Sequence, residues 1–196
     1  WPRKDRVAAE DIPAVVNLVD GPLLDRLATG ALASLVKQGW RLDGSTVQIR
    51  AEHVVIATGS APVELPFLPF GGKVISSTGA LALTEVPDKL CAVGGGYIGL
   101  EIGTAFAKLG STVTVVEAAS RVLPQYDNAL TRPVMKSLKS LGVEVMTDTK
   151  ARGLGEAGLL IETADGAERE IAADKVLVTV GRRPLSDSGN IASLGL

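Results

Sequence analysis

The sequence predicts an α/β fold with a doubly wound parallel sheet and a small antiparallel insert. Short apolar runs rich in β-branched residues alternate with longer segments whose apolar residues recur every three or four positions. Glycines stand at many of the boundaries between these segments, and the chain has 22 of them in 196 residues. Hydrophobic residues make up 46% of the chain, which is enough for the core of one large or two small domains.

The first part of the chain predicts a helix followed by strands. Apolar residues recur at helical spacing over 18–38, and Gly39 follows as a stop signal. Residues 40–57 predict strands around an Asp-Gly turn. The proline- and glycine-rich stretch 61–72 predicts a linker, and residues 74–83 predict a short strand and a short helix.

The middle of the chain predicts a strand, a glycine turn, a helix and a second strand. An apolar run over 90–93 precedes Gly94, Gly96 and Gly99, which have the spacing Gly-x-Gly-x-x-Gly. The following helix is predicted to end at Gly110, with one inward face formed by Ile98, Ile102, Ala105, Phe106 and Leu109. A β-branched run over 112–116 then leads to Glu117.

This pattern is typical of a dinucleotide site. The first glycine permits a tight turn, the second permits close approach of a pyrophosphate, and the third permits close packing of helix on strand. The helix N-terminus offers unpaired N–H groups to the phosphates. Glu117 follows Gly94 by 23 residues, where an acid hydrogen-bonds the adenine ribose, so the pattern favours NAD over NADP. A structural glycine turn without a nucleotide is the alternative.

The second half of the chain predicts one more helix and further strands. A helix is expected over 127–141, with Pro133 causing a kink or a later start. Its expected inward side chains are Leu130, Val134, Leu138 and Leu141. Residues 143–146 predict a third parallel strand, 150–171 an antiparallel meander, and 175–180 a last buried strand, followed by a loop-like tail.

Composition argues against several classes of function. The net charge of −2 provides no basic surface for nucleic acid, and no apolar run is long enough to span a membrane. Cys91 alone cannot form an internal disulfide or a cysteine-rich metal site, so we expect no metal and a small buried side chain. His53, the single histidine, is expected at a strand edge rather than in catalysis. No signal peptide is visible, and we expect a cytoplasmic protein.

Several motifs together resemble the pyridine nucleotide-disulfide oxidoreductases, most closely the dihydrolipoamide dehydrogenases among them. The motifs come in the order and near the spacing of that family and span most of the chain: VVIATGS (54–60), ISSTGAL (75–81), VGGGYIGLEIG (93–103), VTVVEAASRVLPQYD (113–127) and VLVTVGRRP (176–184). They are specific for the superfamily and less specific for the substrate.

The resemblance implies cofactor-binding roles for individual residues. The glycine turn would hold the NAD pyrophosphate, Glu117 the adenosine ribose, and Ala151 would lie beside the adenine. The residues implied to contact or neighbour NAD are Gly94, Gly95, Gly96, Tyr97, Ile98, Gly99, Glu101, Glu117, Ala151, Val180, Gly181 and Arg182. On the FAD side, the resemblance implies Thr58, Gly59 and Ser60.

The resemblance also implies a domain organisation. Residues 1–72 would be part of an FAD domain, 73–184 the NAD-binding domain, and 185–196 the return to the FAD domain. The family's FAD fingerprint, its Cys-x-x-x-x-Cys pair and its His-Glu pair are absent, and the first residue is Trp rather than Met. We therefore expect an excerpt of a longer protein, with no catalytic residue in this chain and no activity alone.

The implied reaction is hydride transfer between NAD and FAD, with a redox disulfide that oxidises dihydrolipoamide. The implied partner is a small-molecule or lipoyl-domain substrate of a 2-oxo acid dehydrogenase complex. The family forms homodimers through a C-terminal domain that this chain lacks. Two alternatives stay open: another reductase of the superfamily, of the glutathione or mercuric type, and a non-catalytic NAD-binding module.

Overall fold

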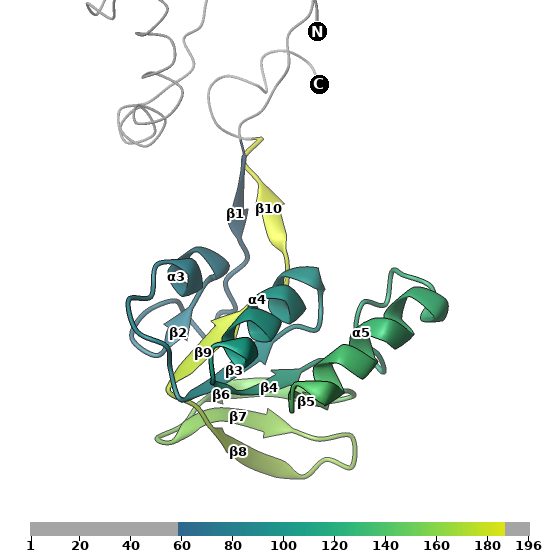
Figure 1. The fold of residues 1–196 in the computed structure, drawn as a ribbon. Helices are drawn as coiled ribbons and strands as arrows, with labels where there is room; N and C mark the ends of the chain where they lie inside the picture. The colour runs from purple at the N-terminus through teal and green to yellow at the C-terminus, as the bar shows by residue number, and fades with distance from the viewer. Residues whose placement is uncertain (1–58, 187–196) are drawn as a thin grey trace, which may run out of the picture. The chain divides into compact units, whose positions relative to one another are not determined.

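The computed structural model describes residues 59–186 (Figure 1). The helix predicted over 18–38, the strands predicted over 40–57 and the tail beyond 186 lie outside the described residues. Residues 61–183 form one compact unit. No helix in the described part of the chain is long and apolar enough to cross a membrane.

A five-stranded, fully parallel sheet forms the centre of this unit. Its strand order is β2-β9-β3-β4-β5, so β9, the last of these strands in sequence, lies between β2 and β3, the first two. The strands are β2 (Val74–Ile75), β3 (Lys89–Val93), β4 (Thr112–Val116), β5 (Glu144–Met146) and β9 (Lys175–Val178). The predicted α/β class with a parallel sheet is confirmed, although β9 ends two residues earlier than predicted.

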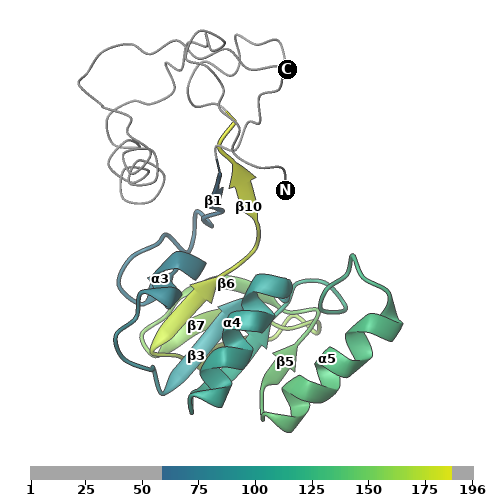
Figure 2. The same cartoon turned by 45° about the horizontal axis from the view of Figure 1, so that its top comes forward.

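Helices cover one face of this sheet. The helices α3 (Ser77–Leu81), α4 (Tyr97–Lys108) and α5 (Asn128–Ser140) all lie on the same side (Figures 1 and 2). Because strand side chains alternate between faces, Leu90 and Ala92 of β3 and Val113 and Val115 of β4 point toward the helices. They form a buried cluster with side chains such as Phe106 of α4.

A three-stranded antiparallel meander covers the opposite face (Figure 1). It consists of β6 (Lys150–Leu154), β7 (Gly158–Glu162) and β8 (Glu168–Ala172). Leu159 and Ile161 of β7 are fully buried and pack against the alternate side chains of the parallel sheet, among them Cys91 and Val176. The predicted insert is therefore a structural layer that buries the second face, where other doubly wound sheets carry helices.

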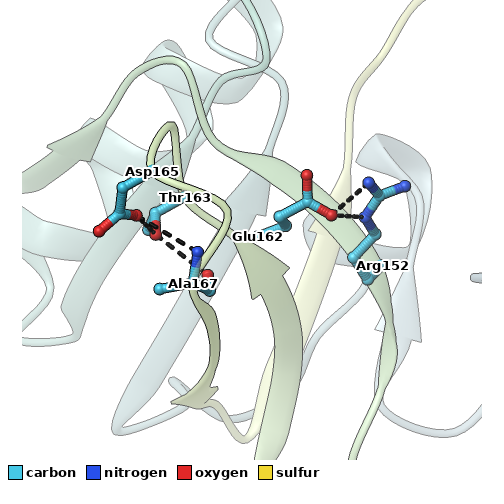
Figure 3. Close-up of polar contacts among 5 residues, drawn as sticks. All are labelled: Arg152, Glu162, Thr163, Asp165 and Ala167. Atoms are coloured by element: carbon cyan, nitrogen blue, oxygen red, sulfur yellow. Dashed lines mark hydrogen bonds and ion pairs between the residues drawn. The ribbon is translucent and has the colours of Figure 1, made fainter.

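Polar contacts join residues of the meander strands and of the turn between β7 and β8 (Figure 3). The Arg152 Nε donates to Glu162 Oε2 at 2.8 Å across β6 and β7, and this pair is solvent-exposed, so it contributes little to stability. In the turn between β7 and β8, Asp165 accepts bonds from the Thr163 hydroxyl (2.5 Å) and the Ala167 N–H (3.3 Å). These bonds lower the pKa of Asp165, and the bond from the Thr163 hydroxyl has the largest effect.

The inward face of α4 differs from the predicted one. Ala105 and Leu109 are exposed, whereas Gly99, Leu100 and Gly103 are buried together with Ile102 and Phe106. Two glycines therefore face the sheet. A Cβ at Gly103 would lie 3.4 Å from Val113 Cγ1, so the small residues let the helix approach β4 closely. A hydrophobic-periodicity argument does not register glycine as a packing residue.

The inward face of α5 also differs from the prediction. Leu130 is 64% exposed, and the neighbouring Thr131 is 7% exposed. Thr131, Val134, Leu138 and Leu141 have the spacing 3-4-3 that places side chains on one helix face, and the Thr131 hydroxyl donates to Asn128 O at 3.3 Å. The predicted helix is confirmed: Asp127 caps it, and it continues through Pro133 rather than starting later.

The segment predicted as a linker is packed into the same unit. Leu68 is fully buried in the cluster between the sheet and the meander, and the compact unit begins at Ala61, so it includes this segment. The prolines and glycines of this segment indicated turns, and the segment was therefore predicted as a linker. A segment with turns can still bury a side chain in the core, as Leu68 does. Two strands were not predicted: β1 (Ser60–Pro62) pairs with β10 (Arg182–Pro184).

Candidate functional site

The glycine turn between β3 and α4 lies at the carboxyl end of the parallel sheet. Gly94 has φ +105°, a backbone conformation that residues other than glycine rarely adopt. A Cβ there would lie 2.8 Å from Thr179 O. The Gly94 N–H donates to Val116 O at 2.8 Å, which joins the turn to the end of β4. The first glycine is thus required by the tight turn itself.

The second and third glycines of the motif have opposite surroundings. A Cβ at Gly99 would lie 2.3 Å from Gly94 O and 2.6 Å from Thr179 Oγ1, so α4 packs against the turn more closely than any side chain permits. A Cβ at Gly96 would meet no atom within 4 Å. One glycine therefore serves packing, and the other leaves open space beside the backbone.

The N-terminus of α4 adjoins this open space and has no side-chain cap. Gly96 is the N-cap residue and provides no side-chain hydrogen bond, and the first turn carries no acidic residue. The backbone N–H groups at a helix start have no intrahelical acceptor and carry partial positive charge. Tyr97 is 58% exposed there, and Ile98 is half-buried.

Glu117 reaches from the end of β4 to the glycine turn. Its Oε2 accepts the Gly95 N–H at 2.6 Å, and its Oε1 accepts the Ala119 N–H at 2.7 Å. A carboxylate oxygen has two lone pairs, so each oxygen keeps an acceptor position for a further donor. The structure therefore brings together the predicted acid and the predicted glycines.

The loop after Glu117 covers the turn from its other side. The Leu123 N–H donates to Gly95 O at 3.0 Å, and a Cβ at Gly95 would lie 2.8 Å from Val122 Cγ1. Arg121 fixes this loop by donating to Asn128 Oδ1 (2.6 Å) and to a backbone carbonyl in the loop. Sequence reasoning assigned no role to these loop residues, because their apolar side chains have no distinctive spacing.

Thr179 was also missed by sequence reasoning. It follows β9, and its hydroxyl lies 3.1 Å from Val93 O and 3.3 Å from Gly94 O. Val180, which is 41% exposed, and Gly181 come next in the chain, so these two predicted residues adjoin the glycine turn. A single threonine at the end of an apolar run carries no signal of such a contact.

The remaining predicted residues lie further along the same elements. Glu101 is exposed on α4, Arg182 is exposed on β10, and Ala151 is half-buried on β6. The strand β6 begins one residue after Thr149, whose N–H donates to Glu117 O at 3.0 Å. On the predicted FAD side, Gly59 and Ser60 are described, and Thr58 lies outside the described residues.

A cavity of about 420 Å³ opens between the loop after β4, the helix α5 and the end of β5. Its lining includes two arginines, Arg121 and Arg132, together with Asn128 and Thr147, and contains no carboxylate. The surface next to the loop that follows Glu117 therefore favours anions. Within the described residues, no group of three His, Cys, Asp or Glu side chains is placed to hold a metal ion.

A family profile matches most of the chain. The profile of the family described as pyridine nucleotide-disulphide oxidoreductase matches residues 26–196.

Curated relatives agree with this match. A dihydrolipoyl dehydrogenase of Pseudomonas aeruginosa is 50% identical over 204 residues, covering 95% of this chain and 44% of the relative. A dihydrolipoyl dehydrogenase of Staphylococcus aureus is 42% identical over 196 residues, covering 93% of this chain and 42% of the relative. The chain thus spans less than half the length of these relatives.

Solved structures with the same fold include two bacterial proteins. The HOCl-induced flavoprotein disulfide reductase RclA from Escherichia coli is 33% identical with a TM-score of 0.59, over 74% of this chain and 34% of that one. LpdA from Mycobacterium tuberculosis is 31% identical with a TM-score of 0.62, over 76% of this chain and 33% of that one.

Proposed function

The chain belongs to the pyridine nucleotide-disulphide oxidoreductase family, and from this premise we propose that residues 73–184 are its NAD-binding part. The observation that carries the proposal is the contact between the Glu117 carboxylate and the Gly95 N–H. It places a hydrogen-bond acceptor for ribose hydroxyls directly beside a turn that is suited to a pyrophosphate.

The glycine turn fits a dinucleotide at three points. The open space at Gly96 admits phosphate oxygens, the uncapped start of α4 supplies N–H donors, and no side-chain carboxylate in the first helical turn repels the anion. The ribose hydroxyls would donate to the lone pairs that Glu117 has left. Ala151 would lie beside the adenine.

The nicotinamide would lie on the other side of the turn. Tyr97 and Ile98 at the start of α4, and Val180 and Gly181 after β9, are the residues proposed to border it. Tyr97 and Val180 are partly exposed, so side-chain surface remains available to a ligand. Glu101 and Arg182 would lie near the edge of this surface.

In this role the chain binds and orients the nucleotide rather than breaking bonds. When bound, NAD supplies a nicotinamide ring that accepts or donates a hydride. The residues of the glycine turn fix the pyrophosphate, Glu117 fixes the ribose, and the two segments around Val180 and Tyr97 limit where the ring lies. No catalytic residue is assigned to this chain.

For the complete protein we propose a dihydrolipoyl dehydrogenase, the activity named for relatives at 42–50% identity. The partner reaction would involve FAD and a redox disulfide, with Thr58, Gly59 and Ser60 on the FAD side. The substrate would be dihydrolipoamide or a lipoyl domain of a 2-oxo acid dehydrogenase complex, and the enzyme would be a homodimer. The divisions 1–72, 73–184 and 185–196 belong to this proposal.

One observation favours a second candidate. Arg121 and Arg132 line the cavity beside the loop that follows Glu117, and guanidinium groups bind phosphates well. An additional phosphate on the ribose, as in NADP, would suit a reductase of the glutathione or mercuric type. The negative charge of Glu117 opposes this alternative, because it would repel that phosphate.

Two measurements on one purified sample test the proposal: the visible absorption spectrum and then a titration with NADH. We expect NADH to bind, and a flavin spectrum would add that FAD is held as well. A sample that does not bind NADH would leave the glycine turn with a structural role only and would contradict the proposal. A lipoamide assay on the same sample tests the expectation that this chain alone is inactive.

A further inference from the structure

The hydroxyl of Thr179 is the one polar side-chain group that joins the end of β9 to the glycine turn among the described residues. It lies 3.1 Å from Val93 O and 3.3 Å from Gly94 O. A hydroxyl has a single hydrogen, so the Thr179 hydroxyl shares that hydrogen between the two carbonyl oxygens. The Thr179 N–H donates to Val93 O as well, at 2.9 Å, which fixes the backbone of Thr179 against the end of β3.

The glycine turn and Thr179 pack closely against each other, with no space for a side chain at Gly94 or Gly99. A Cβ at Gly94 would lie 2.8 Å from Thr179 O, and a Cβ at Gly99 would lie 2.6 Å from Thr179 Oγ1. The carbonyl oxygen of Gly94 therefore lies against both the Thr179 hydroxyl and the start of α4. Its orientation determines the path of the chain into Gly95 and Gly96.

We propose that Thr179 is a positioning residue of the nucleotide site: its hydroxyl fixes Gly94 and so sets the geometry of the turn that receives the pyrophosphate. This inference rests on the proposed function. Thr179 itself does not touch the nucleotide. It acts through Gly94, and it also links the turn to Val180 and Gly181, the segment proposed to border the nicotinamide.

Two matched variants separate the hydroxyl from the shape of the side chain. Thr179→Val keeps a branched side chain of similar size and removes the donor, whereas Thr179→Ser keeps the donor and removes a methyl group. We expect Thr179→Val to weaken the binding of both NADH and ADP-ribose by the same factor, about threefold to tenfold, the ratio that an ordinary hydrogen bond sets. Thr179→Ser should bind both ligands like the wild type.

The binding of ADP-ribose distinguishes the turn from the nicotinamide border, because ADP-ribose has the pyrophosphate and lacks the nicotinamide. A loss confined to NADH would overturn the inference, as would wild-type affinity in Thr179→Val or equal weakness in Thr179→Ser. Circular dichroism of each variant verifies that it is folded.

A second readout does not depend on a nucleotide. The Gly94 N–H donates to Val116 O, so its hydrogen-exchange rate, measured by NMR on the full 196-residue chain, reports how firmly the turn is held. We expect faster exchange in Thr179→Val and wild-type exchange in Thr179→Ser. If the wild type does not bind NADH, the proposed function fails, and unchanged exchange in Thr179→Val would then overturn the inference separately.

Discussion

The Glu117 carboxylate accepts the backbone N–H of Gly95 at 2.6 Å, across 22 residues of sequence. This bond joins the end of β4 to the turn that follows β3, so the acid and the glycines form one structural unit without a ligand. A charged acceptor makes such a hydrogen bond stronger than a neutral one. Glu117 therefore supports the turn, and we propose that it also accepts the ribose hydroxyls.

Replacing Glu117 by alanine is expected to weaken NADH binding by about 1–3 kcal/mol, the contribution of hydrogen bonds to a charged group. Fluorescence titration of NADH measures the affinity. Glu156→Ala is the matched control, because Glu156 is exposed in the β6–β7 hairpin and its loss changes the net charge equally. If the Glu117→Ala protein and the wild type bind NADH with equal affinity, Glu117 does not contribute to the nucleotide site.

Gly99→Ala is expected to destabilise the fold. Its Cβ would lie 2.3 Å from Gly94 O, a backbone atom in a packed turn, so α4 has to shift away from β3. Overpacking of this kind costs about 1–3 kcal/mol. Urea denaturation monitored by circular dichroism measures the effect, and an unchanged midpoint would show that α4 packs less closely than described.

Gly96→Ala is expected to have the opposite profile. The added methyl group meets no protein atom within 4 Å, and the φ of −77° suits alanine, so the loss of stability should be smaller than in Gly99→Ala. The methyl group would occupy the space proposed for the pyrophosphate, so NADH affinity should fall by about tenfold or more, which is ~1.4 kcal/mol. Full NADH affinity in a folded Gly96→Ala protein would place the phosphates elsewhere.

The predicted burial of Cys91 is confirmed, and it has a consequence for pH dependence. Burial, with the nearby Glu144 carboxylate adding to it, raises the pKa of the thiol to about 12. The protein keeps the full stabilising effect of this raised pKa below the ordinary thiol pKa of about 8.5. The effect is lost as the pH rises toward the pKa of the thiol in the folded state.

Between these two values the unfolded state loses a proton that the folded state keeps. The stability of the wild type relative to Cys91→Ala should therefore fall with rising pH, and the slope should approach about 1.4 kcal/mol for each pH unit above pH 9. Urea denaturation of both proteins at pH 8, 9 and 10 measures this difference. A constant difference across the series would mean that the thiol titrates alike in both states.

Sequence patterns predicted the elements well where glycine, β-branched runs and caps coincide. Local chemistry predicted the strand of 112–116, the end of a helix at Gly110 and a helix over 127–141, and the structure confirms each of them. The spacing singled out Glu117 as the acid of the glycine motif, and the structure brings it to the turn because β3 and β4 are adjacent and in register.

Tertiary packing decided what the patterns could not. The burial of Thr131 in place of Leu130 depends on how α5 turns its face to the sheet, and the burial of Leu68 depends on the meander that covers it. The Thr179 hydroxyl bonds to Val93 O, although the two residues are 86 positions apart in sequence. No local signal connects two such positions, so only the folded chain reveals the contact.

The proposed NAD site consists of Glu117 and the glycine turn. Parallel titrations of the wild-type chain with NADH and NADPH test it most directly, since the two ligands differ only in the phosphate on the adenosine ribose. We expect tighter binding of NADH, because the Glu117 carboxylate accepts ribose hydroxyls and repels that phosphate. Equal or tighter binding of NADPH would contradict this proposal and would favour the arginines of the neighbouring cavity as the phosphate-binding residues.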